Sequence, residues 1–193
     1  MKYSKSKIKS CFLNLDRKSF MDIHQESAYF DRAVPIGHGQ TISQPSLVLS
    51  MTLYLDLEPD SKVLEIGTGS GFQTALLAEL SRAVYTIERI NALYIRAEER
   101  LTALGYSNIH FLHGDGHSGW QEHAPFDRIM VTAAGGEVPQ ALINHLAPGG
   151  RMIIPVGDTF HQELKLITKS RNGEVAHSFI EHVMFVEFKS GTE

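Results

Sequence analysis

From residue 62 onward, short apolar runs alternate with longer segments whose apolar positions recur at helical spacing. The short runs predict strands at Lys62–Ile66, Ala83–Ile87, Asn108–Leu112, Asp127–Val131 and Arg151–Val156. The segments between them predict helices at Phe72–Leu80, Asn91–Leu104 and Pro139–Leu146. Asn91 can cap the second of these helices, and Gly105 can end it in a left-handed conformation. This alternation indicates an α/β protein in which helices flank a parallel sheet.

The pattern changes in the last thirty residues or so. Leu164–Thr168 and Val175–Phe179 read as strands on either side of Asn172 and Gly173, and Asn-Gly is a strong hairpin signal. His182–Phe188 reads as a last apolar strand. We therefore expect an antiparallel end on an otherwise parallel sheet.

The segment Pro35–Pro45 is polar and rich in Gly and Pro, which suits it poorly to regular structure. It is either a connecting loop or a binding loop held by a rigid scaffold. Ser43 is a plausible N-cap of a following helix that has Pro45 in its first turn and runs to about Leu57.

Residues 1–9 carry four lysines and no acidic residue, which predicts a frayed and solvated N-terminus. The short apolar run at Cys11 is interrupted by Asn14, so it does not form a secretory signal. We expect a cytoplasmic protein.

Charge and composition narrow the function classes. The chain of 193 residues has 18 Lys and Arg against 22 Asp and Glu, a formal net charge of −4, which argues against a dedicated nucleic-acid binder. Cys11 is the single cysteine, which rules out an intrachain disulfide and a cysteine-based zinc site. No apolar run approaches the ~18 residues that a membrane span needs.

Ten histidines raise the question of metal or acid–base chemistry. The tightest group is His110, His113 and His117, but residues three apart on a strand point to opposite faces. We expect no metal site and histidines scattered over the surface and loops.

The most informative segment runs from Glu65 to Gly71, between a predicted strand and a predicted helix. Glycines there let a ligand approach the backbone, and the helix N-terminus favours an anionic group. The spacing Gly-x-Gly-x-Gly differs from the dinucleotide fingerprint, and the Gly-Lys-Ser/Thr of a P-loop is absent.

Two acidic residues follow the next two strands. Glu88 lies 21 residues after Gly67, where an acid is well placed to accept hydrogen bonds from ribose hydroxyls. Asp115 follows the third strand and could accept a hydrogen bond from an adenine amino group. Since open α/β sheets bind ligands at their carboxyl ends, the three features together suggest a nucleoside cofactor without a pyrophosphate, namely S-adenosylmethionine.

These residues resemble motif I of the class I methyltransferases. The chain is more narrowly similar to the protein-L-isoaspartate O-methyltransferase family over about residues 16–189. The similarity is carried by Pro35–Pro45, Val63–Gly71, Gly114–Gly116, Thr132–Ala134 and Gly149–Gly157. The chain departs from the family at Val186–Phe188, where a Val-Pro-Leu-like run is usual.

The resemblance implies a three-layer Rossmann-like fold with a seven-stranded, mostly parallel sheet and an antiparallel C-terminal hairpin. It implies transfer of a methyl group from S-adenosyl-L-methionine to the free carboxylate of L-isoaspartyl residues in damaged proteins. Ser43 would be the catalytic residue, with Gln40, Thr41 and Ile42 beside it in the substrate site. The cofactor would be held by Glu65, Gly67, Thr68, Gly69, Gly71, Glu88, Asp115 and Gly116.

The resemblance also implies an organisation of the chain. We expect one methyltransferase domain over residues 1–193, with an N-terminal helical segment (1–30), a substrate loop and helix (31–57) and a cofactor-binding sheet core (58–193). The partners would be isoaspartyl-containing proteins and peptides, with no nucleic acid and no membrane. We expect a monomer, although the sequence does not reveal the oligomeric state.

The predicted chemistry needs no strong base, because a carboxylate with a pKa near 4 is already ionised at pH 7. Ser43 would then orient the carboxylate rather than attack it. Two other functions stay open: methylation of another acceptor, such as RNA or a small molecule, and cofactor binding without turnover.

Overall fold

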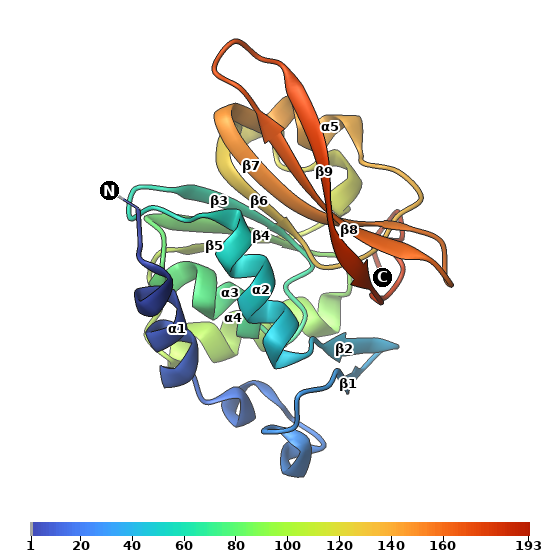
Figure 1. Cartoon of the computed structure of the whole chain (residues 1–193). Helices are drawn as coiled ribbons and strands as arrows, with labels where there is room; N and C mark the ends of the chain where they lie inside the picture. The colour runs from blue at the N-terminus through green and yellow to red at the C-terminus, as the bar shows by residue number, and fades with distance from the viewer. Residues whose placement is uncertain (1) are drawn as a thin grey trace.

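The computed structural model describes residues 2–193, and a seven-stranded sheet organises it (Figure 1). The strand order is β5-β4-β3-β6-β7-β8-β9. The first five strands of this order pair in parallel, and β8 and β9 are antiparallel. The strands are β3 Lys62–Ile66, β4 Ala83–Glu88, β5 Ile109–His113, β6 Phe126–Val131, β7 Leu146–Gly157, β8 Gln162–Lys169 and β9 Val175–Val183. The expected fold class, including the C-terminal hairpin, is confirmed.

Helices cover both faces of the sheet. They are α1 Lys5–Asn14, α2 Pro45–Leu55, α3 Phe72–Glu79, α4 Asn91–Ala103 and α5 Gln140–His145. In Figure 1, α1 to α4 lie together on one side of the sheet and α5 lies on the other. Because alternate strand residues point to opposite faces, Val63 packs in the cluster beneath α2 and α3, while Leu64 packs in the cluster that contains Leu142 of α5.

The N-terminal segment is helical, so the expectation of a frayed N-terminus is wrong for most of its length. The side chain of Ser4 caps α1 by accepting a hydrogen bond from the Lys7 backbone N–H at 3.2 Å. Ile8 and Cys11, three residues apart, are buried on the same side of the helix, and this side packs against the core. The lysines lie on its solvated side, and short 3₁₀ turns at Arg17–Phe20 (η1) and Gln25–Ser27 (η2) follow.

Two predicted ends of elements differ from the structure. Helix α5 is shorter than expected, because Leu146 already begins β7. Asn91 is the first residue of α4 rather than its cap, which is Ile90. The end of α4 is as predicted: Gly105 has φ +86°, and the Tyr106 N–H reaches back to the Leu101 carbonyl at 3.2 Å.

The separate last strand expected at His182–Phe188 does not form. Strand β9 ends at Val183, and the chain then leaves the edge of the sheet and crosses toward the end of β6. There the Ala134 N–H donates to the Val186 carbonyl and the Phe188 N–H donates to the Ala134 carbonyl, both at 2.8 Å. Val186–Phe188 therefore form hydrogen bonds with Ala134 instead of continuing β9, and they lie at the carboxyl ends of the central strands.

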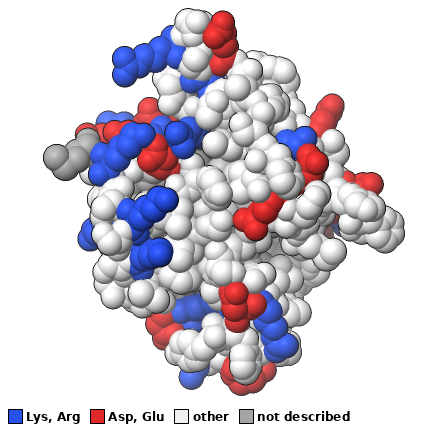
Figure 2. Space-filling view, in the orientation of Figure 1, with Lys and Arg blue, Asp and Glu red and all other residues white. Residues whose placement is uncertain are grey.

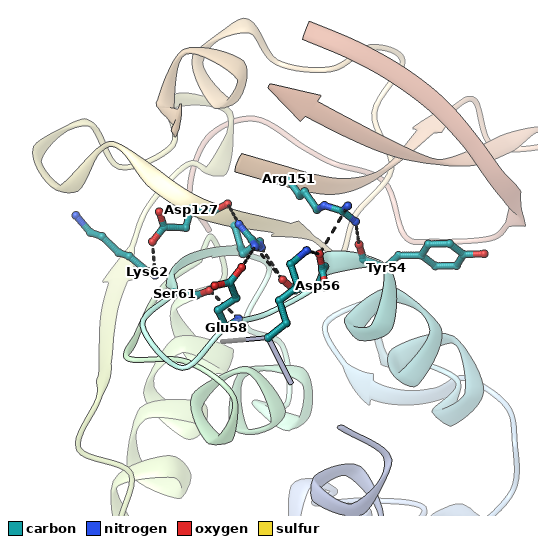
Figure 3. A network of polar contacts seen from close by, with 9 residues as sticks. Tyr54, Asp56, Glu58, Ser61, Lys62, Asp127 and Arg151 are labelled. Atoms are coloured by element: carbon teal, nitrogen blue, oxygen red, sulfur yellow. Dashed lines mark hydrogen bonds and ion pairs between the residues drawn. The ribbon is translucent and has the colours of Figure 1, made fainter. Parts of the chain in front are cut away.

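A polar network fixes the opposite end of the sheet (Figure 3). The turn after α2 places the Asp56 carbonyl where the guanidinium of buried Arg128 donates to it at 2.9 and 3.0 Å. Arg151 forms an ion pair with the Asp56 carboxylate at 3.6 Å, and the Lys62 N–H donates to Asp127 at 2.8 Å. This network anchors the C-terminal end of α2 to β6 and β7, and it joins β3 to β6. Within residues 2–193 there is no helix with the length and apolar character that crossing a membrane requires.

Candidate functional site

A cavity opens at the carboxyl ends of β3, β4 and β6, where open α/β sheets bind their ligands. One end is bounded by Gln40, Thr41, Ile42 and Ser43. The floor is the loop between β3 and α3, and the far end is formed by Glu88, Arg89 and Gly116. Val186–Lys189, displaced from the sheet edge, complete its wall. The cavity therefore links the two regions that the sequence marked as substrate loop and cofactor loop.

The glycine loop lies so close to its neighbours that side chains would not fit. Gly67 has φ +93°, and a Cβ there would lie 2.4 Å from Oγ1 of Thr132. Gly71, at φ +85°, is the N-cap of α3. The positive φ values and close packing explain the glycines, and they leave backbone groups facing the cavity.

Glu65 lies beneath this loop and does not line the cavity. It is fully buried, and its Oε2 accepts hydrogen bonds from the hydroxyls of Thr74 at 2.6 Å and Thr86 at 2.7 Å. Burial raises the pKa of the Glu65 carboxyl to about 8, which the two threonine bonds oppose and nearby Glu88 increases. Its Oε1 has no hydrogen-bond partner among the described residues, which leaves a polar atom free beneath the loop.

Glu88 lines the cavity and holds the glycine loop at the same time. Its Oε2 accepts a hydrogen bond from the Gly69 N–H at 2.8 Å, and its Oε1 accepts one from the Ile90 N–H at 2.9 Å. A carboxylate offers about four lone-pair sites, so both oxygens can accept further bonds from hydroxyl groups. The position fits the predicted role toward a ribose.

Asp115 is engaged by the C-terminal segment and does not itself line the cavity. Its Oδ2 accepts a hydrogen bond from the Gly191 N–H at 2.7 Å, and its Oδ1 accepts one from the His117 N–H at 2.8 Å. These bonds lower the pKa of the Asp115 carboxyl, against the desolvation that would raise it. The neighbouring Gly116 does line the cavity, beside the ring of Phe188.

Ser43 is not the N-cap of α2, as its sequence position suggests; the cap residue is Gln44. Asp31 takes over the capping, because its Oδ1 accepts the Ser46 N–H at 2.8 Å and its Oδ2 accepts the Gln44 side-chain amide at 3.1 Å. These bonds lower the pKa of the Asp31 carboxyl. With the cap supplied from elsewhere, the Ser43 hydroxyl makes no hydrogen bond within the described residues and borders the cavity.

The loop before Ser43 is more regular than its composition suggests. Val34–Gly37 (β1) and Gln40–Ile42 (β2) form a small antiparallel ribbon in which Val34 pairs with Ile42. The connecting residues Gly37, His38 and Gly39 all have positive φ, which allows the tight reversal. Val34, Ile36 and Ile42 are buried, so one face of the ribbon packs into the core and fixes the loop.

Arg17 holds this loop from behind, and sequence reasoning did not identify it. The buried guanidinium donates hydrogen bonds to the carbonyls of Ala28, Arg32, Ile42 and Ser43, at 2.9 to 3.3 Å. Burial lowers the pKa of this guanidinium, while Asp31 opposes the shift. No local pattern around residue 17 signals this role, because all four acceptors are backbone atoms distant in the sequence.

A second hollow adjoins the cavity at Ser43, and we call it the substrate groove because residues of the substrate loop and helix expected from the sequence (31–57) form part of its wall. It lies between the first turns of α2 and the chain from the end of β9 to Val186. Thr41, Ser43 and Val186 border both spaces. A molecule in the groove can therefore present a group to the cavity past the Ser43 hydroxyl.

Nine of the twelve residues predicted for the site line the cavity: Gln40, Thr41, Ile42, Ser43, Gly67, Thr68, Gly69, Glu88 and Gly116. Glu65, Gly71 and Asp115 lie behind it. Sequence reasoning missed the lining residues Arg89 and Lys189, which no residue spacing connects with the glycine loop. Phe188 belongs to the run Val186–Phe188, at which the sequence departs from the family. Thr132 and Ala133 also line it, and their place after the β6 strand is a signal of the kind that identified Glu88.

The histidines form no metal site in the part of the chain described, where no group of three His, Cys, Asp or Glu side chains could hold an ion. One histidine departs from the expected surface position. His145 is buried, its Nε2 lies 2.6 Å from the side-chain oxygen of Gln121, and burial lowers the pKa of its imidazole.

The site fits a nucleoside-bearing sulfonium cofactor on its own geometry. The cavity is lined by both the glycine loop and Glu88, and it borders the unpaired Ser43 hydroxyl. The backbone groups of the loop offer polar partners to the amino acid end of such a cofactor.

Comparisons with known proteins agree with this reading. Residues 2–193 match the family model described as Protein-L-isoaspartate(D-aspartate) O-methyltransferase. The chain is 54% identical over 160 residues to Protein-L-isoaspartate O-methyltransferase 2 of Polaromonas sp., covering 82% of this chain and 76% of the relative. It is 52% identical over 180 residues to the protein-L-isoaspartate O-methyltransferase of Vibrio atlanticus, covering 92% and 85%.

A solved structure gives the same result for the fold. A Plasmodium falciparum chain, titled as a protein-L-isoaspartate O-methyltransferase in complex with S-adenosyl-L-homocysteine, superimposes with a TM-score of 0.81 at 29% identity. The match covers 94% of this chain and 89% of that one.

Proposed function

Since the chain belongs to the protein-L-isoaspartate O-methyltransferase family, we propose that it methylates the free carboxylate of L-isoaspartyl residues in proteins and peptides, with S-adenosyl-L-methionine as cofactor. The modification starts the repair of the damaged residue. The observation that carries the proposal is the continuous cavity from the glycine loop to Ser43, with the substrate groove opening at Ser43.

We assign the cofactor to the residues at the carboxyl ends of β3 to β5. The loop Gly67–Gly71, which includes Thr68, would hold its methionine end, with Glu65 supporting the loop from beneath. Glu88 would accept hydrogen bonds from the ribose hydroxyls, while Asp115 and Gly116 would form the part of the site that holds the adenine. When bound, this cofactor supplies an electrophilic methyl group on a sulfonium.

The substrate carboxylate would lie at the junction of cavity and groove. There the Ser43 hydroxyl can donate a hydrogen bond to one carboxylate oxygen and leave the other facing the cavity. The ionised carboxylate needs no base, so residues Gln40–Ser43 contribute by aligning it and excluding water. Ser43 and the residues beside it would thus present one carboxylate oxygen to the methyl group that the bound cofactor supplies.

Further properties belong to the same proposal. We take residues 1–193 as one domain, supported by a core cluster that joins Ile8 of α1 to Leu76 of α3. We propose a monomer that acts on polypeptides and not on nucleic acid, in keeping with the net charge of −4. We also propose a cytoplasmic location, with which the buried free Cys11 agrees.

The test is methyl incorporation from labelled cofactor into matched peptides that differ only in isoaspartate against aspartate. We expect label in the isoaspartyl peptide alone. Thermal stabilisation by S-adenosylhomocysteine without methylation of the isoaspartyl peptide would contradict the proposal. That result would favour another acceptor or a cofactor-binding protein without turnover.

A further inference from the structure

We propose that Glu181 selects the residues that flank the isoaspartyl residue, favouring substrates with Lys or Arg near it and disfavouring those with Asp or Glu. This inference rests on the proposed function and specifies its substrates further. It starts from the substrate groove, the space beside the cavity that the methyl transfer itself does not need.

The shape of the groove suits an extended polypeptide. One wall is the outer side of α2, with Ser46, Leu47 and Ser50, and the other is the chain from Glu181 to Val186. Because β9 lies at the edge of the sheet, no further strand covers this wall. The groove joins the cavity at Ser43, so a chain that presents its carboxylate there must lay its neighbouring residues along these walls.

The groove has one fixed charge among its lining residues. Glu181 is exposed, and no Lys or Arg is among the residues that line the groove. Its Oε1 accepts a hydrogen bond from the Ser50 hydroxyl at 3.2 Å, which directs the carboxylate toward α2. Glu181 has no ion pair with any described residue, whereas Glu187 nearby has Lys189 at 4.0 Å.

The charges on the wider surface agree with a groove that is acidic rather than basic. Figure 2 shows that the middle of this face is mostly uncharged, with some acidic atoms, while Lys and Arg atoms gather mainly toward the edges. An unpaired carboxylate at the wall of an otherwise uncharged groove attracts a cation and repels an anion more strongly than one surrounded by counter-charges.

The length of α2 places Glu181 relative to the reacting group. From Pro45 to Ser50 the helix rises about 7.5 Å, and the two residues from Ser43 to Pro45 add up to about 7 Å. An extended chain covers between about 7.5 and 14 Å in two to four residues. Glu181 is therefore expected to face a residue two to four positions from the isoaspartyl residue, on one side of it.

The experiment uses the full-length enzyme and isoaspartyl peptides that are identical except for one residue, which is Lys, Gln or Glu. The variable residue is placed two, three or four positions before or after the isoaspartyl residue. The value measured is kcat/KM at low salt and pH 8, where imidazoles are ordinarily neutral. On one side we expect Lys peptides to exceed Glu peptides by about fivefold or more, with the ratio falling at 0.5 M salt.

Two variants locate the effect. Glu181→Gln is expected to bring the Lys-to-Glu ratio below about two. Glu174→Gln removes the same charge in the β8–β9 turn, away from the groove, and is expected to keep the wild-type ratio. A thermal shift with S-adenosylhomocysteine shows that each variant is folded and holds its cofactor.

The outcomes separate the two proposals. Methylation of all isoaspartyl peptides with equal kcat/KM, or a ratio that survives Glu181→Gln, overturns the role of Glu181 and leaves the proposed function standing. Methylation of none of the isoaspartyl peptides by the folded enzyme overturns the proposed function and this inference with it.

Discussion

At the scale of single residues, the site depends on which polar atoms already have hydrogen-bond partners within the protein. The Ser43 carbonyl is held by Arg17, and its hydroxyl is left for the cavity and the groove. The Glu65 carboxyl is the reverse case, buried beneath the glycine loop and held by two threonines. The first residue can act on a substrate, and the second can act only by supporting the loop above it.

Ser43→Ala removes one hydroxyl at the junction of cavity and groove. We expect kcat/KM for an isoaspartyl peptide to fall by about tenfold or more, because a charge-assisted hydrogen bond to the carboxylate is lost. The Kd for S-adenosylhomocysteine by calorimetry should stay within about threefold. Ser107→Ala, at an exposed serine far from the cavity, is the control, and a full rate in Ser43→Ala would refute the assignment.

Glu65 makes stability depend on pH in a direction that can be worked out. Its pKa is raised from 4.5 to about 8 in the folded protein, so folding takes up a proton between these values. The stability contributed by the neutral carboxyl is therefore present at pH 4.5 and is lost as the pH rises to about 8. The loss from this group between pH 5 and 8 is on the order of 3 kcal/mol.

Urea unfolding of the wild type and of Glu65→Gln at pH 5, 6, 7 and 8 measures this contribution. Gln keeps the shape and cannot ionise, so the stability of the variant relative to wild type should rise with pH. A difference between the two proteins that does not change with pH would show that Glu65 titrates normally.

At the scale of elements, the cavity is made by two short segments that only glycine-rich sequences can form. The loop between β3 and α3 needs positive φ at Gly67, Gly69 and Gly71, and the β1–β2 ribbon reverses through Gly37–Gly39. Both lie at the edge where β3, β4 and β6 end. Their shape is intrinsic, but their position is set by what holds them, which is Glu88 for the loop and Arg17 for the ribbon.

Gly67→Ala tests the close approach of the loop to β6. The alanine methyl group would lie 2.4 Å from Oγ1 of Thr132, and the alanine backbone would have to adopt φ +93°. We expect a loss of about 2 kcal/mol or more in urea unfolding and at least tenfold weaker binding of S-adenosylhomocysteine. Gly136→Ala is the matched control, since nothing lies within 4 Å of its Cβ position.

Arg17→Lys tests the support of the ribbon. A lysine ammonium cannot span the carbonyls of Ala28, Arg32 and Ser43, which the planar guanidinium reaches together. We expect a loss of about 2 kcal/mol in stability and a fall in kcat/KM larger than any change in cofactor Kd. An unchanged kcat/KM in the folded variant would mean that the Ser43 loop keeps its position without the Arg17 guanidinium.

At the scale of the whole molecule, the last residues of the chain cross the end of the sheet at which we place the cofactor. The Glu193 N–H donates to the Arg89 carbonyl at 2.8 Å, and the Glu193 carbonyl accepts the Asn91 N–H at 2.7 Å. With the bond from Gly191 to Asp115, these contacts tie the last residues across the ends of β4 and β5. The segment that leaves β9 thus forms a strap over the part of the site that we assign to the adenine.

Deletion of residues 190–193 should release this strap. We expect the dissociation of S-adenosylhomocysteine, followed by stopped-flow fluorescence, to become about threefold or more faster. Glu193→Gln removes only the exposed ion pair with Arg89 and should change the rate little. An unchanged rate in the deleted chain would show that the strap does not limit cofactor exchange.

The sequence by itself determined the parallel strands, the glycine loop, Glu88 and the C-terminal hairpin. Each of these follows from local signals, namely apolar periodicity, glycine spacing and the Asn-Gly turn. It could not give the clamp by Arg17, the cap by Asp31 or the crossing of Val186–Phe188 to Ala134, because each joins groups that only folding brings together. Hydrogen bonds to backbone atoms leave no trace in residue type. For this reason Arg17, Asp31 and the crossing segment, which hold the Ser43 side of the site, were decided by the tertiary structure alone.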